Sequence, residues 1–229
     1  MKKKRILALF LAAVSCLSLA VSASAAGTTT RKATDFKDYD RTAWYAEAVS
    51  AAVDNGLLYG KSSTMLDPNG DMTRAEMAAI INRSFGCYKA ADISQYKDVA
   101  KSKWYYKDVA MAVQMGTYNG RSSSAMAPDA PISRQEAMAV VARALELDYD
   151  SYSKTDLSTF SDRSEISNWA LPYVRAMVGA DYIHGRGKTL APLDNITRAE
   201  FAQIFYNIIG TYIVSKGTYD KDIKGSVLI

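Results

Sequence analysis

The sequence is short of the residues that staple small secreted proteins or carry most enzyme chemistry. Its 229 residues include two cysteines and one histidine. Cys16 lies in an N-terminal leader, which leaves Cys87 without an intramolecular partner, so the fold must be held by a hydrophobic core. We interpret Cys87 as a small apolar filler and assign no chemical role to His184. The sequence shows no metal-ligand cluster and no catalytic set built on histidine, so no cofactor is expected.

Long apolar runs are also scarce. Residues 6–21 form one, preceded by four cations and followed by Ala23-Ser24-Ala25. This order predicts a secretory signal peptide at residues 1–25 rather than a membrane span, with a lipoprotein cysteine at Cys16 as the alternative. Without the leader, 24 basic residues balance 24 acidic ones. The absence of net charge gives no support to a nucleic-acid partner.

One four-residue pattern occurs three times, as residues 73–76, 133–136 and 197–200: Ser or Thr, then Arg, then Ala or Gln, then Glu. The hydroxyl and the Glu form the capping box that begins a helix. The Arg is not explained in this way, because a cation in the first turn opposes the helix dipole. A guanidinium beside free N–H groups at a helix N-terminus can instead form an anion site.

The pattern belongs to an internal repeat. Each copy has, in the same order, an aromatic residue and Asp, a Trp, a Gly sixteen residues after that Trp, a Pro, and the capped helix. Apolar residues at helical spacing follow each Trp and each box, so every copy is predicted to be a helix, a long loop and a second helix. Because one such pair cannot bury its apolar face well, the three are expected to pack together. The predicted repeats are residues 33–91, 92–150 and 156–215, followed by a short tail at 216–229.

These motifs resemble the S-layer homology family over about residues 33–215. The resemblance implies an all-α fold, in which three helix-loop-helix repeats pack as a pseudo-threefold bundle with grooves between neighbouring units. It also implies non-covalent anchoring to a secondary cell wall polymer on peptidoglycan, often a glycan with pyruvylated N-acetylmannosamine. The implied location is secreted and associated with the cell wall. By matching motif positions, the implied ligand-binding residues are Arg74, Arg134, Arg198, Trp44, Trp104, Trp169, Gly60, Gly120, Gly185, Asp38, Asp98 and Asp162.

Each type of residue also has a structural interpretation. The arginines could form surface ion pairs, which contribute little. The tryptophans could stack on sugars or lie in the core. The aspartates are interpreted mainly as caps or brackets of the first helix, the glutamates mainly as helix caps, and the glycines as positions of positive φ or close approach. A second cation follows each loop glycine and could face the same groove or the solvent: Lys61, Arg121 and Arg186.

Copy three departs most from the pattern, since it has an extra residue between Asp162 and Trp169 and a shortened loop. Copy two has Gln135 where the others have Ala, which we interpret as a mild change on the helix surface.

Three classes of function can be compared. The leading hypothesis is a non-catalytic module that binds an anionic wall glycan, because a pyruvyl carboxylate suits the planar fork of arginine. A glycan hydrolase would need two carboxylates facing one bond, one with a raised pKa. The repeated acids here lie near arginine, which favours ionisation. An adaptor that binds other envelope proteins is the third possibility.

Overall fold

The computed structural model describes residues 31–209 and confirms the all-α prediction. Each repeat contributes two α-helices joined by a long loop. The first helices are α2 (Ala46–Asp54), α4 (Tyr106–Met115) and α6 (Leu171–Gly179). The second helices are α3 (Arg74–Phe85), α5 (Arg134–Ala144) and α7 (Arg198–Ile209). Short 3-10 turns occur at η2 (Ala33–Asp35), η3 (Tyr149–Tyr152) and η4 (Arg163–Glu165). Between residues 31 and 209 the only β pairing consists of isolated bridges.

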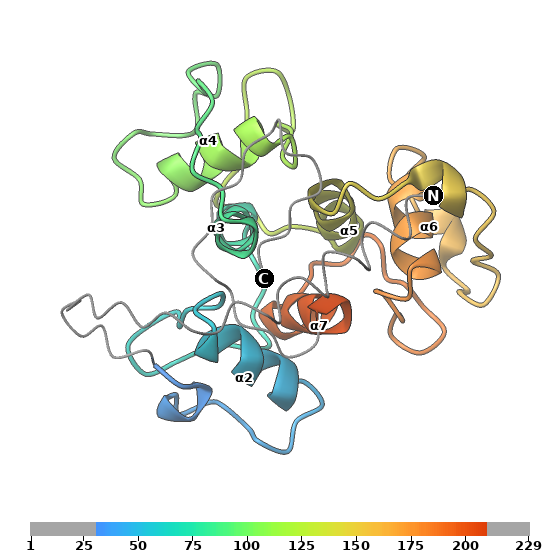
Figure 1. Ribbon diagram of the computed structural model, residues 1–229, viewed down its shortest axis with the longest axis horizontal. Helices are drawn as coiled ribbons and strands as arrows, with labels where there is room; N and C mark the ends of the chain where they lie inside the picture. Colours follow the sequence, from blue (N-terminus) through green and yellow to red (C-terminus); the bar gives the residue numbers. More distant parts are fainter. Residues whose placement is uncertain (1–30, 210–229) are drawn as a thin grey trace, which may run out of the picture.

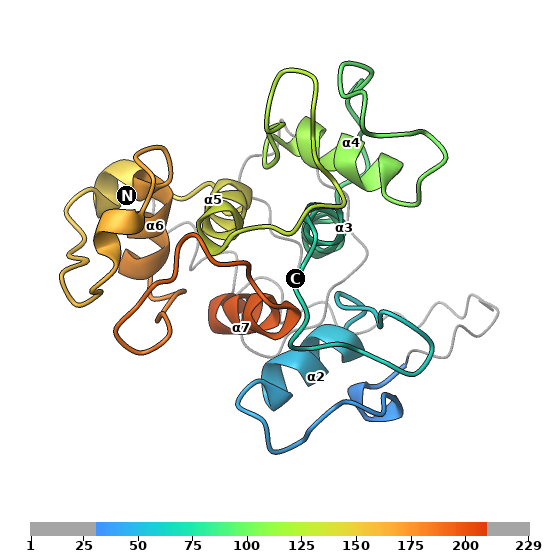
Figure 2. The same cartoon turned by 180° about the vertical axis from the view of Figure 1, so that it is seen from behind.

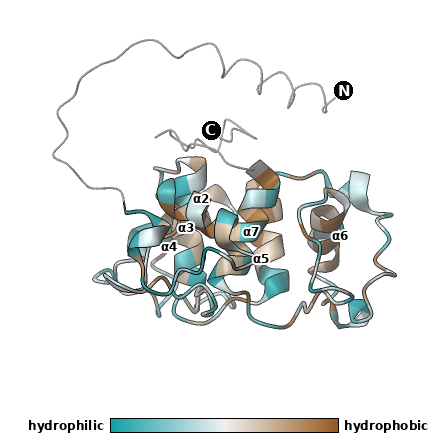
Figure 3. Ribbon diagram, turned by 90° about the horizontal axis from the view of Figure 1, so that it is seen from below, coloured by the Kyte–Doolittle hydropathy of each residue, from teal (hydrophilic) through white to brown (hydrophobic). Residues whose placement is uncertain are grey.

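The three repeats form a pseudo-threefold arrangement. Helices α3, α5 and α7 surround the centre of the molecule, and α2, α4 and α6 lie outside them (Figure 1). Each outer helix packs against the central helix of the preceding repeat, so that α4 lies on α3, α6 on α5, and α2 on α7. A side view shows α6 set off from the central helices as one of the three prongs (Figure 3). The two helices of one repeat are therefore not each other's main partners, and the repeats interlock.

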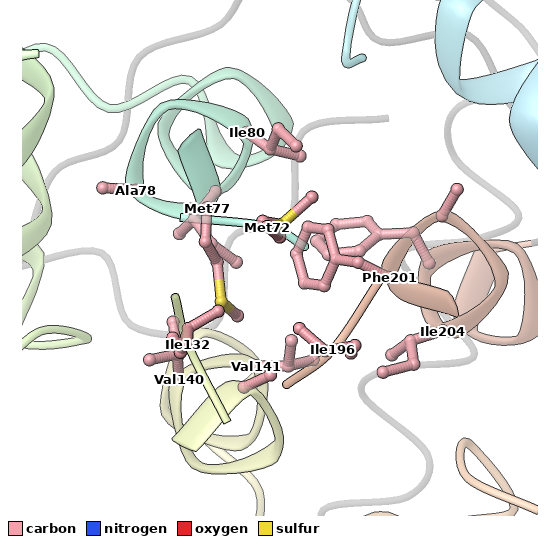
Figure 4. Close-up of a cluster of buried hydrophobic side chains, with 14 of the residues drawn as sticks. Met72, Met77, Ala78, Ile80, Ile132, Val140, Val141, Ile196, Phe201 and Ile204 are labelled. Atoms are coloured by element: carbon pink, nitrogen blue, oxygen red, sulfur yellow. The ribbon is translucent and has the colours of Figure 1, made fainter. Parts of the chain in front are cut away.

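The core follows the predicted apolar stripes. Val49, Val109 and Val174 on the outer helices are 0 to 1% exposed, and Met77, Met138 and Phe201 on the central helices are equally buried. Close to the axis, Met72, Ile132 and Ile196 meet in the space between α3, α5 and α7 (Figure 4). Because this core takes side chains from all three repeats, no repeat can bury its apolar residues alone.

The loops before the central helices are joined by backbone hydrogen bonds. Met72 N donates to Ile196 O, Ile132 N to Met72 O, and Ile196 N to Ile132 O, each at 3.0 Å. These three bonds form a closed circle although the chain is linear. Figure 2 shows the three segments passing close to the axis beside α3, α5 and α7. The circle fixes where each central helix begins.

Several predictions concern residues outside the described range. The signal peptide at 1–25 and the tail at 216–229 lie there, and the repeat boundaries stay predictions. Within residues 31–209, no helix combines the length and apolar character that crossing a membrane requires.

Candidate functional site

The three capping boxes form as predicted. In α3, Glu76 N donates to Thr73 Oγ1 at 3.2 Å, and Thr73 N donates to a Glu76 carboxylate oxygen at 3.0 Å. The same pair of bonds joins Ser133 to Glu136 in α5 and Thr197 to Glu200 in α7. The glutamates are therefore helix caps, and the sequence pattern identified their partners correctly.

The sequence predicted that free N–H groups in the first turn of these helices could bind an anion. That prediction is wrong, because these groups already donate to backbone carbonyls. Arg74 N donates to Ala130 O at 3.0 Å, and Ala75 N donates to Pro128 O at 2.9 Å. Both acceptors lie in the loop of repeat 2. The equivalent groups of α5 donate to the loop of repeat 3, and those of α7 to the loop of repeat 1. Each helix N-terminus is thus satisfied by the neighbouring repeat, which sequence alone does not reveal.

The box arginines are buried, contrary to the picture of surface ion pairs. Arg74, Arg134 and Arg198 are 5%, 4% and 2% exposed. Arg74 Nε donates to Met126 O at 2.9 Å, and its Nη2 donates to Asn119 O at the same distance. The Nε groups of the other two donate to carbonyls one repeat ahead, at Leu190 and Leu66. Each guanidinium therefore holds the loop of another repeat.

The same arginines form ion pairs with the capping glutamates of the next repeat. The Nη1 to carboxylate distances are 3.1 Å for Arg74–Glu136, 3.1 Å for Arg134–Glu200, and 3.6 Å for Arg198–Glu76. The third pair joins the last repeat to the first. We call these six residues the arginine ring. A cation in the first helical turn, unfavourable for its own helix, is explained by this inter-repeat bond.

Each capping glutamate also binds the cation that follows its own loop glycine. Lys61 Nζ lies 2.6 Å from Glu76, Arg121 Nη2 lies 3.3 Å from Glu136, and Arg186 Nε lies 2.6 Å from Glu200. The side chains of these cations are 34%, 47% and 38% exposed. They are neither buried nor freely solvated, so each glutamate lies between one buried and one accessible cation.

These contacts and burial shift the pKa values of four residues of the ring. Burial raises the pKa of Glu76, but the hydrogen bond from Lys61 and the cap bond at Thr73 outweigh it, and the pKa is lowered overall. The pKa of Glu200 is lowered in the same way, with Arg186 as the main opposing donor. Burial lowers the pKa values of Arg134 and Arg198, against the favourable charges of Glu200 and Glu76. The carboxylates of Glu76 and Glu200 are thus held ionised at neutral pH.

The motif tryptophans lie at the surface, which excludes their core interpretation. Trp44, Trp104 and Trp169 are 64%, 61% and 49% exposed. In the first two repeats the next residue takes the core position instead, since Tyr45 is 6% and Tyr105 is 1% exposed. Each of these tyrosine rings lies nearly perpendicular to its neighbouring indole, with ring centroids 5.4 Å apart. About half or more of each tryptophan is thus exposed at the surface.

The motif aspartates bracket the loop, not the first helix as expected. Both carboxylate oxygens of Asp38 accept backbone N–H groups, from Leu66 at 2.8 Å and Asp67 at 2.7 Å. Asp98 and Asp162 bind the equivalent residues of their own repeats. The second residue held in each repeat has a positive φ although it is not glycine: Asp67, Ala127 and Ala191. The aspartate therefore stabilises a strained turn just before the loop proline.

The loop glycines are required by close approach. A Cβ atom on Gly60 would lie 2.3 Å from the Phe36 ring, and one on Gly120 would lie 2.4 Å from the Tyr96 ring. Gly185 is similarly close to Phe160 and also has a φ of +75°. The motif aromatic before the Asp thus packs on its own loop glycine, which places the following cation.

Two clefts collect the predicted residues. The first, the 2–3 cleft, lies between repeats 2 and 3 and has a volume of about 870 Å³. It is lined by residues that include Arg74, Gly120, Arg121, Glu136, Arg143 and Trp169. Three guanidinium groups and one carboxylate thus line it beside an exposed indole.

The second, the 3–1 cleft, lies between repeats 3 and 1 and has a volume of about 510 Å³. Its lining includes Trp44, Arg134, Gly185, Arg186 and Glu200. Arg186 there also binds Asp194 at 2.8 Å, so this cleft is less positive than the 2–3 cleft.

Each cleft is assembled from three repeats. The buried arginine comes from one repeat, the loop glycine and accessible cation from the next, and the tryptophan from the one after that. In the same order, a third set would combine the buried Arg198 with Gly60 and Lys61 of the next loop and with Trp104. The structure therefore brings arginine, glycine and tryptophan together, but from different copies of the motif.

Sequence reasoning missed two side chains at the 2–3 cleft. Arg143 lies 4.6 Å from the centroid of the Tyr173 ring and donates to its hydroxyl at 3.2 Å. No carboxylate pairs with Arg143 among residues 31–209. Gln135 is only 5% exposed and exchanges two hydrogen bonds of 3.0 Å with Ser167, so its interpretation as a mild surface change is wrong. The sequence did contain a signal for Arg143, because Arg83 occupies the same position of α3.

The described residues contain no group of three or more His, Cys, Asp or Glu side chains placed to hold a metal ion. Burial raises the pKa of Cys87 to about 11, which fits an unreactive thiol.

Comparison with known proteins identifies a domain family and several relatives that are similar to this chain. The S-layer homology domain family matches the chain three times, at residues 35–78, 95–138 and 159–202. The surface-layer 125 kDa protein of Lysinibacillus sphaericus is 34% identical over 182 residues, which cover 77% of this chain and 15% of that protein.

Two further relatives cover a similar part of the chain. The amylopullulanase of Thermoanaerobacterium thermosulfurigenes is 29% identical over 200 residues, or 81% of this chain and 11% of that protein. The S-layer protein sap of Bacillus anthracis is 24% identical over 168 residues, which cover 73% of this chain and 20% of that protein. This chain therefore spans only a small part of the length of these relatives.

Proposed function

The chain belongs to the S-layer homology domain family, whose domains are non-catalytic modules that anchor proteins at the cell surface, and we propose that it does so by binding an anionic wall polysaccharide in the clefts between its repeats. The proposed ligand group is the carboxylate of a pyruvylated amino sugar in a secondary cell wall polymer. Proteins named for the surface layer and for glycan degradation share this region, which fits an anchoring part common to proteins with different activities.

The observation that carries the proposal is the composition of the 2–3 cleft. Three guanidinium groups face one carboxylate there, so the cleft has an excess of positive charge to offer an anion. Arg121 is half-exposed and has donors beyond its 3.3 Å contact with Glu136. The exposed Trp169 indole can stack on the apolar face of a sugar. Cation and aromatic together suit a sugar that carries a carboxylate.

The twelve residues predicted from the sequence keep different roles in this proposal. The three tryptophans contact the ligand. They do so together with the accessible cations that follow the loop glycines, which are not among the twelve. Arg74 and Arg134 form the base of the two clefts, where their charge attracts the anion while their forks hold a neighbouring loop; Arg198 is proposed to act in the same way with Lys61 and Trp104. Gly60, Gly120 and Gly185 let the loops approach closely, and Asp38, Asp98 and Asp162 fix the shape of those loops.

Calorimetry with a pyruvylated N-acetylmannosamine disaccharide tests the proposal. Wild-type protein should bind it, and the disaccharide without pyruvate should bind at least tenfold more weakly, because a hydrogen bond to a charged group is worth about 1.5–3 kcal/mol. Arg121→Gln and Trp169→Ala should each weaken binding about fivefold or more. Lys107→Gln, an exposed charge change on α4 outside the clefts, is the matched control.

The outcomes separate the parts of the proposal. Equal affinity for the two disaccharides would contradict recognition of the pyruvyl group. Wild-type affinity in both cleft variants would contradict the cleft as the binding site, even if the protein still sediments with cell walls.

A further inference from the structure

A separate pocket lies on the other side of α6 from the 2–3 cleft. It has a volume of about 470 Å³ and is lined by residues 154–158 together with Arg163, Leu171 and Arg175. We call it the linker pocket, because residues 154–158 belong to the segment that joins repeats 2 and 3. Tyr173 faces the 2–3 cleft, whereas Leu171 and Arg175 face the linker pocket. Residues two apart on a helix do not share a face, so α6 separates the two sites.

The linker pocket carries more positive than negative charge. Three cations line it, Lys154, Arg163 and Arg175, and one carboxylate, Asp156. Asp156 accepts the backbone N–H of Ser158 at 2.8 Å and its hydroxyl at 2.7 Å. These bonds direct the carboxylate to the local turn. No ion pair neutralises any of the three cations within the described part of the chain.

Arg175 supplies an unused donor. Its Nε is buried and has no hydrogen-bond acceptor among the described residues. Nearby Arg163 has only a long contact of 3.5 Å from Nη1 to Phe160 O. A buried donor without a partner is rare, and it marks Arg175 as a side chain whose hydrogen bonds the described residues do not complete.

The two arginines of the linker pocket are not repeated in the other two copies. The equivalents of Arg175 are Ser50 and Ala110, and those of Arg163 are Tyr39 and Val99. In repeat 2 the linker backbone bonds directly to the helix at this point, since Ala91 N donates to Ala110 O at 3.0 Å.

The longer linker of repeat 3 instead folds into η3, which packs on α6 (Figure 1). It approaches α6 closely at Gly179, where a Cβ atom would lie 2.4 Å from Thr155 Oγ1. The three cations, the close approach and the extra length therefore occur together, and none is needed to complete the repeat.

We infer that the linker pocket binds a phosphate group, either free phosphate or a phosphate carried by a wall polymer. Two guanidinium groups and one ammonium group match its charge and its several acceptor oxygens. Within the described residues no carboxylate forms an ion pair with Lys154, Arg163 or Arg175, so their charge can attract an anion. The pocket is larger than one phosphate, which leaves space for the polymer on either side. This site is independent of the clefts and does not rest on their proposed ligand.

NMR titration of the ¹⁵N-labelled protein at constant ionic strength tests the inference. Inorganic phosphate should cause saturable shifts at residues 154–158 and at Arg175. Arg175→Gln should weaken binding about tenfold, and Lys154→Gln, at an exposed linker position that the fold does not need, should weaken it a few-fold. Lys107→Gln, the same loss of charge on α4, should have no effect. A short glycerol phosphate oligomer is titrated in parallel.

The two arms identify the source of the phosphate. Tighter binding of the oligomer assigns the pocket to a phosphodiester polymer, and tighter binding of inorganic phosphate assigns it to the free ion. The absence of saturable shifts with both probes would overturn the inference. The inference would also be overturned if Arg175→Gln and Lys154→Gln lost no more phosphate affinity than Lys107→Gln. Binding of the pyruvylated disaccharide in the clefts is a separate measurement and can succeed or fail independently.

Discussion

At the base of the clefts the three box arginines make the same Nε bond, whereas at the rim the side chains differ from one repeat to another. The Nε groups of Arg74, Arg134 and Arg198 each donate to a loop carbonyl one repeat ahead, at 2.9, 2.8 and 3.0 Å. At the rim, the residue after the loop glycine is a lysine in repeat 1 and an arginine in repeats 2 and 3. The rim position on the central helix is Arg83, Arg143 or Asn207.

The difference follows from solvent. The three Nε donors at the base are buried against carbonyls, and the three Nη1 groups pair with carboxylates, so a changed side chain there would leave a buried group unpaired. At the rim, water can replace a lost partner, and several side chains are tolerated. The base therefore determines whether the ring of repeats closes, and the rim determines what each cleft prefers to bind. The excess charge of the 2–3 cleft over the 3–1 cleft is a rim property of this kind.

Opening the arginine ring should have the largest effect on stability. Arg198→Ala removes the bonds to Leu66 and Tyr59 of repeat 1 and the ion pair with Glu76. Removing one partner of a buried ion pair leaves buried polar groups uncompensated, and we expect the free energy of unfolding to fall by about 3–5 kcal/mol. Urea denaturation followed by circular dichroism measures this loss.

The matched change at the rim is Arg121→Ala. This side chain is 47% exposed, and its ion pair with Glu136 should contribute about 0–1 kcal/mol. Arg198→Lys should lie between the two, because lysine keeps the charge but not the planar fork. If Arg198→Ala were no more destabilising than Arg121→Ala, the base would not be what closes the molecule.

Acid should weaken the base through its carboxylates. Folding lowers the pKa values of Glu76 and Glu200. The stabilisation is therefore present above the unfolded glutamate pKa, near 4.3, and is lost as the pH falls through the folded values. We expect the urea midpoint to fall as the pH is lowered below about 5.

Glu200→Gln should reduce that pH dependence, because one of the two ring carboxylates with a lowered pKa is gone. The same substitution at the exposed Glu165 is the control and should leave the slope as in wild type. An unchanged slope in Glu200→Gln would show that other groups cause the acid sensitivity.

The sequence predicted much of the base but not its connections. The capping boxes were evident because both partners lie within four residues of each other. The partner of Arg74 was not evident, because Glu136 is one of three equivalent glutamates and only the packing order of the repeats selects it. At the rim, helical spacing placed Tyr45 on the buried stripe, but it did not decide whether the adjacent Trp44 lies in the core or faces a ligand. The linker pocket depends on the path of residues 147–157, which no repeat motif describes.

The smallest expected effect concerns a residue at the base that differs between the repeats. Gln135 stands where the other repeats have Ala75 and Ala199, and it accepts the Ser167 N–H and donates to the Ser167 hydroxyl. The carbonyl of Ser167 in turn accepts from Leu171 at the start of α6. Gln135→Ala should lower the free energy of unfolding by about 1 kcal/mol, the usual net value of such bonds. It should also speed hydrogen exchange in the first turn of α6.

Gln114→Ala on α4 is the matched control, since it makes the same substitution on a half-buried helical glutamine and should change stability by less than about 0.5 kcal/mol. Glycan binding by Gln135→Ala then shows whether the contact between Gln135 and Ser167 matters only for stability or also for the 2–3 cleft. Trp169 lies two residues after Ser167, so a loosened α6 should also weaken glycan binding in the 2–3 cleft while leaving the 3–1 cleft unchanged. Equal weakening in both clefts would instead indicate a general loss of stability, and the asymmetry at Gln135 would then have no consequence for recognition.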